Sequence, residues 1–188
     1  RDTDRSRGLG DVYKRQKSGS GFTRGWGFRT EIGTAAVPNY ESLVKFIPEK
    51  DLWPINDMWN LHYFGQMAFN AGPERHTAVI ENSYGGAKDA KEFCMKSQWV
   101  SYESNKALYE GWLDHMWNDA TGVMLWMSGA SYPSMVWQTY DYYYDLTGAY
   151  FGCKQACEPV HIYWNPVTEE VKACLLYTSP SPRDRSVS

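Results

Sequence analysis

The sequence predicts an α/β fold with parallel strands. Two short segments with the character of strands, 25–32 and 123–127, are separated by a long helical segment that runs from Lys88 to about Trp117. Further helical patterns follow the second strand, and alternation of strands with helices is typical of a parallel sheet covered by helices. The strands are too few to close a barrel, and no internal repeat is visible.

The first predicted strand, 25–32 (GWGFRTEI), alternates apolar and polar residues and ends at Gly33, which indicates a turn. Pro38 favours a short helix at Asn39–Phe46. Residues 49–86 are predicted to be a long, aromatic, irregular segment with short helices, and segments of this length are usually functional in compact domains.

The long helix is predicted to be amphipathic, with a seam of small residues suited to close packing on a sheet. Its apolar face carries Ala90, Phe93, Ser97, Val100, Ser104, Ala107, Leu108 and Gly111. Its charged face carries Glu92, Lys96, Glu103, Lys106 and Glu110.

The run 123–127 (VMLWM) is continuously apolar, as expected of a strand buried on both faces. A polar loop, Ser128–Ser134, follows it. Helices are then predicted at Met135–Tyr144 and Gly148–Ala156, and the stretch from His161 to Val171 indicates the start of a β-rich unit.

The composition excludes some classes of function. The net charge of −3 argues against a nucleic-acid partner, which would require a basic patch. No run of about 18 apolar residues is present, so no membrane span is expected. The 9 Trp and 14 Tyr residues suit core packing, and they also suit stacking on the apolar faces of sugars.

The two ends differ from the rest of the chain, because residues 1–16 and 174–188 are basic, rich in Ser, Pro and Arg, and without periodicity. GLGDVYKRQ and CLLYTSPSPRD resemble translations of the two strands of a transposon-based sequencing-library adapter. We therefore expect 1–16 and 174–188 to be non-native tails, with disordered natural tails as the alternative. The natural gene is expected to continue beyond 17–173 in both directions.

Three cysteines lie within 17–173: Cys94, Cys153 and Cys157. A CxxxC pair is a weak metal signal, and no His lies at a matching spacing. We interpret the thiols as buried and structural, and we expect no metal and no cofactor.

Glu31 and Trp126 are the residues whose positions suggest chemistry. Each lies at the end of a predicted strand, and sites of (β/α)₈ barrels gather at the C-terminal ends of the strands. Neighbouring parallel strands would place the Glu31 carboxylate beside the Trp126 indole, a suitable wall for a sugar ring. Position alone leaves open an ion pair between Glu31 and Arg29, and a core role for Trp126.

Several segments resemble glycoside hydrolase family 2, most closely its exo-β-D-glucosaminidases and mannosylglycoprotein endo-β-mannosidases. GFRTEIGTAAVPNYESLVKFIPEKDLWP is similar to the family's nucleophile region. DMWNLHYFG, KSQWVSYESNKALYEGW and GVMLWMSGASYPSMVWQTYDYYYDLTGAYFGCKQACEPVHIYWNP match in the same order. The resemblance implies a partial TIM (β/α)₈ barrel at 17–158, comprising strands 7 and 8 with their helices, and the start of a β-sandwich domain at 159–173.

The resemblance also implies roles for individual residues. Glu31 corresponds to the nucleophile at the end of strand 7, and Trp126 to the tryptophan that ends strand 8 and lines the sugar site. The remaining implied sugar-site residues are Tyr132 in the following loop, Trp137 on a closing helix, and Asn60 and His62 in a loop motif. Many relatives have Asn-Ser-Glu where this chain has Arg29–Thr30–Glu31, which leaves the substrate open.

A retaining glycosidase needs two carboxyl groups about 5–5.5 Å apart. The resemblance places the acid/base on strand 4, before Lys17, and Glu41, Glu103 and Glu110 are interpreted as solvated or structural. We therefore expect an inactive fragment of a retaining, exo-acting β-glycosidase.

The expected substrate is an oligosaccharide or glycoconjugate with β-linked glucosamine or mannose, and the full-length protein is expected to be secreted or periplasmic. The alternative is a non-catalytic carbohydrate-binding or structural module, with Glu31 on a surface far from Trp126.

Overall fold

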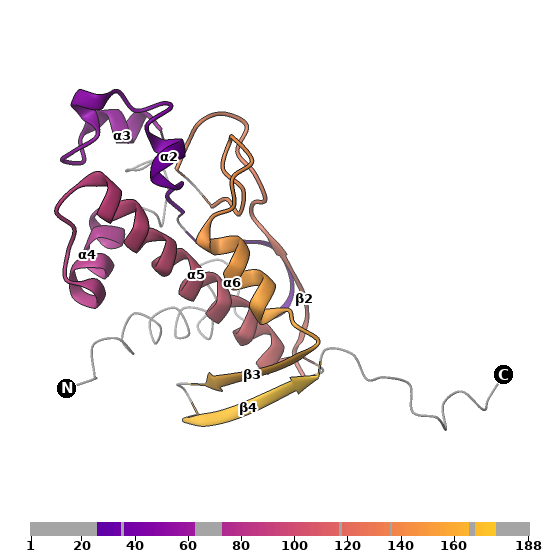
Figure 1. The fold of residues 1–188 in the computed structure, drawn as a ribbon. Helices are drawn as coiled ribbons and strands as arrows, with labels where there is room; N and C mark the ends of the chain where they lie inside the picture. The colour runs from indigo at the N-terminus through magenta and orange to yellow at the C-terminus, as the bar shows by residue number, and fades with distance from the viewer. Residues whose placement is uncertain are drawn as a thin grey trace, which may run out of the picture.

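A computed structural model of the protein describes residues 26–34, 36–62, 73–116, 118–135, 137–165 and 168–175. The elements are β1 (Gly27–Ile32), α2 (Tyr40–Leu43), a 3₁₀ turn (Glu49–Asp51), α3 (Asp57–Leu61), α4 (Pro73–Tyr84), α5 (Ala90–Asp114), β2 (Ala120–Leu125), α6 (Gly148–Ala156), β3 (Val160–Asn165) and β4 (Glu170–Leu175). The long helix α5 runs through the centre, with α6 beside it and the β3–β4 hairpin near its C-terminal end (Figure 1).

Strands β1 and β2 pair in parallel, with Gly27 opposite Ala120 and Ile32 opposite Leu125. The pairing agrees with the predicted parallel strands, although β2 begins three residues before the predicted start. The prediction that the run 123–127 is buried on both faces is wrong for this chain, because Met124 and Trp126 are exposed. The packing of β2 is one-sided: Ala120 lies in a small apolar cluster with Trp26 and Trp112 of α5.

Helix α6 spans the predicted residues and packs closely along α5. A Cβ atom on Gly148 would lie 2.0 Å from the carbonyl oxygen of Gln98, and one on Gly152 would lie 2.3 Å from that of Tyr102. Such distances allow only glycine at these two positions. The backbones of α5 and α6 therefore approach each other closely at Gly148 and Gly152. The seam predicted on α5 was expected to meet a sheet, whereas α5 packs mainly on another helix.

The segment 49–86 is more helical than predicted, because it contains the 12-residue helix α4. Ile80 of α4 is buried with Phe93 of α5 and with Trp59 of α3 in the main apolar cluster. The ring centroids of Trp59 and Phe93 lie 5.6 Å apart in an edge-to-face arrangement. Residues 63–72 of this segment, which include the end of the DMWNLHYFG motif, lie outside the described residues.

The helix predicted at Met135–Tyr144 is wrong, because the described residues there form turns and isolated bridges. Asp141 explains the difference: its Oδ1 accepts hydrogen bonds from the backbone N–H groups of Tyr143 (2.8 Å) and Asp145 (2.9 Å). Such local side-chain bonds compete with helical ones. Tyr144 is left-handed with φ 64°, which also interrupts a helix.

The β3–β4 hairpin is the predicted β-rich unit, and one of its faces packs on α5. Glu110 was assigned to the charged, outward face of α5, but it is buried, and its carboxylate lies 2.7 Å from His161 Nε2 and 3.2 Å from Lys106 Nζ. The pattern within α5 could not reveal this burial, because the partner His161 lies 51 residues further along the chain. Strand β4 also includes Cys174 and Leu175, which the sequence analysis assigned to the non-native tail; the rest of both predicted tails lies outside the described residues.

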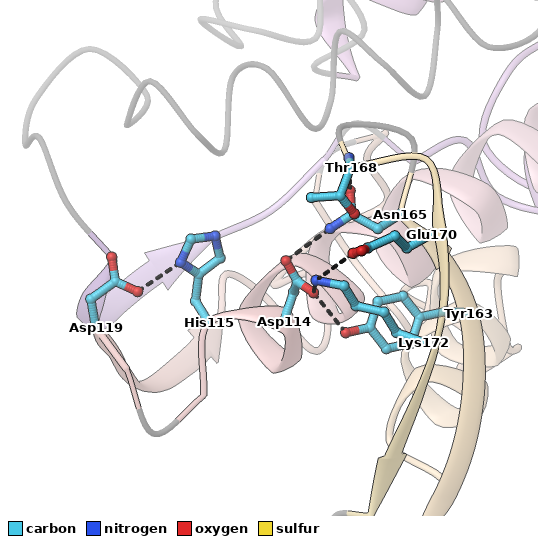
Figure 2. Close-up of polar contacts among 8 residues, drawn as sticks. All are labelled: Asp114, His115, Asp119, Tyr163, Asn165, Thr168, Glu170 and Lys172. Carbon is cyan, nitrogen blue, oxygen red and sulfur yellow. Dashed lines mark hydrogen bonds and ion pairs between the residues drawn. The ribbon is translucent and has the colours of Figure 1, made fainter.

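Asp114 is the polar centre of this contact. Figure 2 shows Tyr163, Asn165 and Lys172 pointing toward its carboxylate, and each donates a hydrogen bond to it, at 3.0, 2.8 and 2.5 Å. Burial raises the pKa of Asp114, but the bonds from Lys172, Tyr163 and Asn165 outweigh burial and lower that pKa below its usual value. The hairpin is therefore held to α5 by an ionised carboxylate.

A buried histidine in α4 gives the first prediction. His76 lies 3.0 Å from Ser97 Oγ, and desolvation lowers its pKa from 6.5 to about 4. Because the unfolded chain binds the proton first, the free energy of unfolding should be highest above pH 6.5 and fall by about 3 kcal/mol as the pH approaches 4. Urea unfolding at several pH values should show this loss.

The matched control is His76→Gln, which retains a hydrogen-bonding group but does not titrate. The carboxylates titrate in both proteins, so the difference between the two pH profiles isolates His76. Equal losses of stability in the two proteins would contradict a buried neutral His76.

Candidate functional site

The C-terminal ends of β1 and β2 bring Glu31 and Trp126 to the same edge of the two-stranded sheet. Ile32 is paired with Leu125, and the Trp126 N–H donates a 2.8 Å hydrogen bond to the Ile32 carbonyl oxygen. Glu31 therefore precedes the last pair of residues and Trp126 follows it. The placement is the one expected for neighbouring parallel strands.

Both side chains at this edge are accessible. Glu31 is exposed, and Trp126 is 46% exposed, so Trp126 is not a core residue in this chain. Among the described residues, no ion pair joins Glu31 to Arg29. The Arg29 guanidinium instead lies over the Trp112 ring, 5.8 Å from its centroid, as a cation–π contact.

Gly33 fixes how closely the two strand ends meet. A Cβ atom at this position would lie 1.9 Å from the Trp126 carbonyl oxygen and 2.9 Å from Trp137 Cβ. The sequence analysis interpreted Gly33 only as a turn, because nothing within 25–32 reveals the residues that face it. The peptide bond between Trp126 and Met127 is cis.

Trp137 lies beside the strand ends, although not on the predicted closing helix. The Met127 N–H donates to its carbonyl oxygen. Trp137 thus joins Gly33 and Trp126 in one cluster built from two distant parts of the chain. The structure brings three of the predicted elements of the site together here: the end of β1, the end of β2 and Trp137.

Tyr132 lies in the loop after β2 and is 43% exposed. The base of this loop is closed at Ser128, whose carbonyl oxygen accepts from the N–H groups of Thr139 (3.1 Å) and Tyr140 (2.7 Å) and from Thr139 Oγ1 (2.9 Å). The far side of the loop ends at Met135, which is fully buried in the main apolar cluster.

His62 and Asn60, the remaining predicted site residues, differ in their contacts. His62 Nδ1 lies 2.7 Å from the Pro133 carbonyl oxygen, and the Met135 N–H donates to the His62 carbonyl oxygen at 2.7 Å. Asn60 is exposed and donates a long 3.4 Å bond to Asp57 within its own helix. His62 is therefore joined to the Tyr132 loop, whereas within the described part of the chain Asn60 shows no contact with that loop.

Two polar residues of α5 support the site and were missed by the sequence analysis. Gln98 Nε2 donates to the Val37 carbonyl oxygen and Gln98 Oε1 accepts from the Gly148 N–H, both at 2.8 Å. The buried Asn105 donates a 2.9 Å bond to Thr34 Oγ1, just after β1. A single amide within a helical segment gives no sign of such partners, because they lie more than 40 residues away.

Two of the other carboxylates named by the sequence analysis have structural contacts elsewhere. Glu103 accepts a 2.6 Å hydrogen bond from the Tyr84 hydroxyl, and Glu110 binds His161. Burial raises the pKa of Cys94 to about 12 and that of Cys153 to about 12. The interpretation of all three thiols as buried is wrong for Cys157, which is exposed. In the described part of the chain, no three His, Cys, Asp or Glu side chains gather as a metal site, and no helix is long and apolar enough to cross a membrane.

Comparison with known proteins finds exo-β-D-glucosaminidases and β-mannosidases among the relatives. No family model matches the chain. An exo-β-D-glucosaminidase of Hypocrea jecorina is 31% identical over 157 residues, which are 78% of this chain. A mannosylglycoprotein endo-β-mannosidase of Lilium longiflorum is 29% identical over 158 residues, which are 76% of this chain. The chain is related to the β-glycosidases of glycoside hydrolase family 2.

The chain spans 16–17% of the length of these two relatives. An exo-chitosanase of Amycolatopsis orientalis matches 85% of this chain and 20% of its own, with a TM-score of 0.70 and 25% identity. A β-D-mannosidase from Dictyoglomus thermophilum matches 78% of this chain and 18% of its own, with a TM-score of 0.68 and 24% identity, and shows the same fold. The chain therefore matches only a part of each of these enzymes.

The close approach at Gly33 yields the second prediction. Gly33→Ala should lower the free energy of unfolding by about 3 kcal/mol, because the methyl group overlaps the Trp126 carbonyl and forces the strand ends apart. Gly129→Ala is a matched control in the neighbouring loop, since its nearest atom would be the Tyr140 carbonyl oxygen at 3.9 Å.

Urea unfolding of both variants is the measurement. Gly129→Ala should remain within about 0.5 kcal/mol of the parent. Equal stability of Gly33→Ala and Gly129→Ala would contradict the packing of the two strand ends described above.

Proposed function

We propose that this chain is the part of a retaining, exo-acting β-glycosidase that carries the catalytic nucleophile, Glu31. The substrate class is an oligosaccharide or glycoconjugate that ends in β-linked glucosamine or mannose. The names of the curated relatives, exo-β-D-glucosaminidase and mannosylglycoprotein endo-β-mannosidase, support this pair of sugars.

One observation carries the proposal. An accessible carboxylate, Glu31, and an accessible indole, Trp126, lie at the same edge of two paired parallel strands. Flat aromatic rings pack against the apolar faces of sugars, and a nearby carboxylate can reach the anomeric carbon of a sugar placed there. A carboxylate engaged in an ion pair would be less available, and no ion pair joins Glu31 to Arg29 in the described chain.

The proposed reaction is a double displacement. The Glu31 carboxylate attacks the anomeric carbon and forms an ester while the glycosidic oxygen leaves with a proton from a second carboxylic acid. That second residue then deprotonates a water molecule, which releases the sugar from Glu31 with the original configuration. Trp126 and Tyr132 would line the sugar site, and Trp137 packs against the strand ends.

The second carboxylate is proposed to lie outside this chain. Glu103 and Glu110 are bound to Tyr84 and His161, and Glu41 is exposed on α2. We also propose that β1 and β2 are strands 7 and 8 of a (β/α)₈ barrel, with β3–β4 as the start of a β-sandwich. The full-length enzyme would then be secreted or periplasmic.

The third prediction concerns the chain by itself. It should hydrolyse aryl β-glucosaminides and β-mannosides no faster than buffer alone does, because the nucleophile lacks its acid/base partner. The release of the chromogenic aryl alcohol is the measurement. Hydrolysis by the isolated chain that disappears in Glu31→Ala would contradict the proposed position of the acid/base.

The fourth prediction tests Glu31 in a complete enzyme. Residues 17–173 would replace the matched segment of the exo-β-D-glucosaminidase of Hypocrea jecorina. Glu31→Ala should then lower kcat by about 10³-fold or more, as removal of a covalent nucleophile does. Added azide should restore turnover and give the α-glycosyl azide, whereas Glu41→Ala should keep the parent rate.

An unchanged rate in Glu31→Ala would overturn the nucleophile assignment. A folded chimera that binds the sugar but shows no hydrolysis would instead favour the alternative function, a non-catalytic carbohydrate-binding module.

A further inference from the structure

His62 makes an unusual pair of contacts for a residue at the end of a short helix. It follows α3 directly, and both its ring and its backbone bind the loop that lies 71 residues further along the chain. The two contacts reach Pro133 and Met135, on either side of Ser134. A histidine used only as a helix end would need neither contact.

The contact with Pro133 shows that the His62 ring carries a hydrogen on Nδ1. A carbonyl oxygen only accepts hydrogen bonds, so the Nδ1 of His62, 2.7 Å away, carries the hydrogen. The ring itself is placed by Phe46, whose centroid lies 4.7 Å from that of His62. The donor is thus held in direction by ring packing as well as by the hydrogen bond.

The bond acts on the residue next to Tyr132. Pro133 has a restricted φ, so fixing its carbonyl limits the directions available to the peptide that carries Tyr132. Met135 is fully buried, and Ser128 is bonded to Thr139 and Tyr140 at the base of the loop. His62 completes these anchors on the side of the loop that leads to Tyr132.

We propose that His62 is a positioning residue that holds the Tyr132–Pro133 segment of the loop that follows Trp126, and that it affects sugar binding through this loop. The inference rests on the proposed function, because the loop would form one wall of the proposed sugar site. A positioning role and direct contact with the sugar would use different ring nitrogens of His62. Positioning depends on Nδ1, and direct contact would depend on Nε2.

Three substitutions separate the two roles. In His62→Asn, the side-chain amide nitrogen lies close to the position of Nδ1 and can still donate to Pro133. In His62→Gln, the amide instead reaches the position of Nε2. His62→Phe keeps the ring packing on Phe46 but removes both nitrogens, and Leu61→Ala is the control because Leu61 is adjacent to His62 and 72% exposed.

The experiment combines two readouts on the full chain. Hydrogen exchange of the Met135 amide reports the loop anchor without any sugar present. Titration of the chain, labelled with 5-fluorotryptophan and with Trp126 assigned by a Trp126→Phe variant, reports binding of β-linked glucosamine and mannose disaccharides by ¹⁹F NMR.

Positioning predicts that His62→Phe and His62→Gln exchange Met135 about fivefold faster and bind sugar about fivefold more weakly. His62→Asn and Leu61→Ala should stay within twofold of the parent in both readouts, by the same reasoning. Unchanged Met135 exchange in His62→Phe would overturn the proposal. So would sugar binding that is lost in His62→Asn but kept in His62→Gln.

The two proposals fail in different ways. If the parent chain binds neither disaccharide, the result counts against the proposed function. The order of the exchange rates among the three variants would still decide whether His62 anchors the loop.

Discussion

The site depends on the close backbone contact between the ends of β1 and β2. The Ile32 carbonyl accepts from the Trp126 N–H, and Gly33 leaves room for the Trp126 carbonyl. This contact sets the distance between β1, which carries Glu31, and the end of β2, which Trp126 follows. Trp137 packs onto the same point, so a shift of either strand end would move Glu31, Trp126 and Trp137 relative to one another.

Helix α5 holds this arrangement in place through polar groups as well as apolar ones. Gln98 joins the chain after β1 to the start of α6, and Asn105 binds Thr34. At the other end of the helix, Asp114 binds the β3–β4 hairpin. In the barrel that we propose, Glu31 lies at the face used for catalysis and the hairpin lies at the opposite face, where contacts serve stability.

The local hydrophobic pattern was enough to predict those elements whose residues show one clear periodicity. The alternation in β1, the apolar run in β2, the long amphipathic α5 and the Gly148–Ala156 helix were all recognisable. The helix at Met135–Tyr144 failed because the pattern could not show that Asp141 would bind its own backbone. Helix α4 was missed because the aromatic, Pro- and Gly-containing surroundings of 49–86 suggested a loop.

The candidate site was only partly predictable for a similar reason. Glu31 and Trp126 could be paired from strand order alone, since parallel strands end at the same edge. The roles of Gly33, Gln98 and Glu110 depend on residues far away in the chain, and a single sequence does not reveal such partners. His62 was assigned to the site, but its contact with Pro133 became visible only in three dimensions.

Covalent trapping would test the central claim most directly. The chimeric enzyme that contains residues 17–173 would be incubated with a fluorinated β-glycoside that forms the glycosyl-enzyme faster than water releases it. Peptide mass spectrometry would then locate the ester. A single sugar on Glu31, within the peptide that contains Arg29–Thr30–Glu31, is the expected result. A label on any other carboxylate, with Glu31 unmodified, would contradict it.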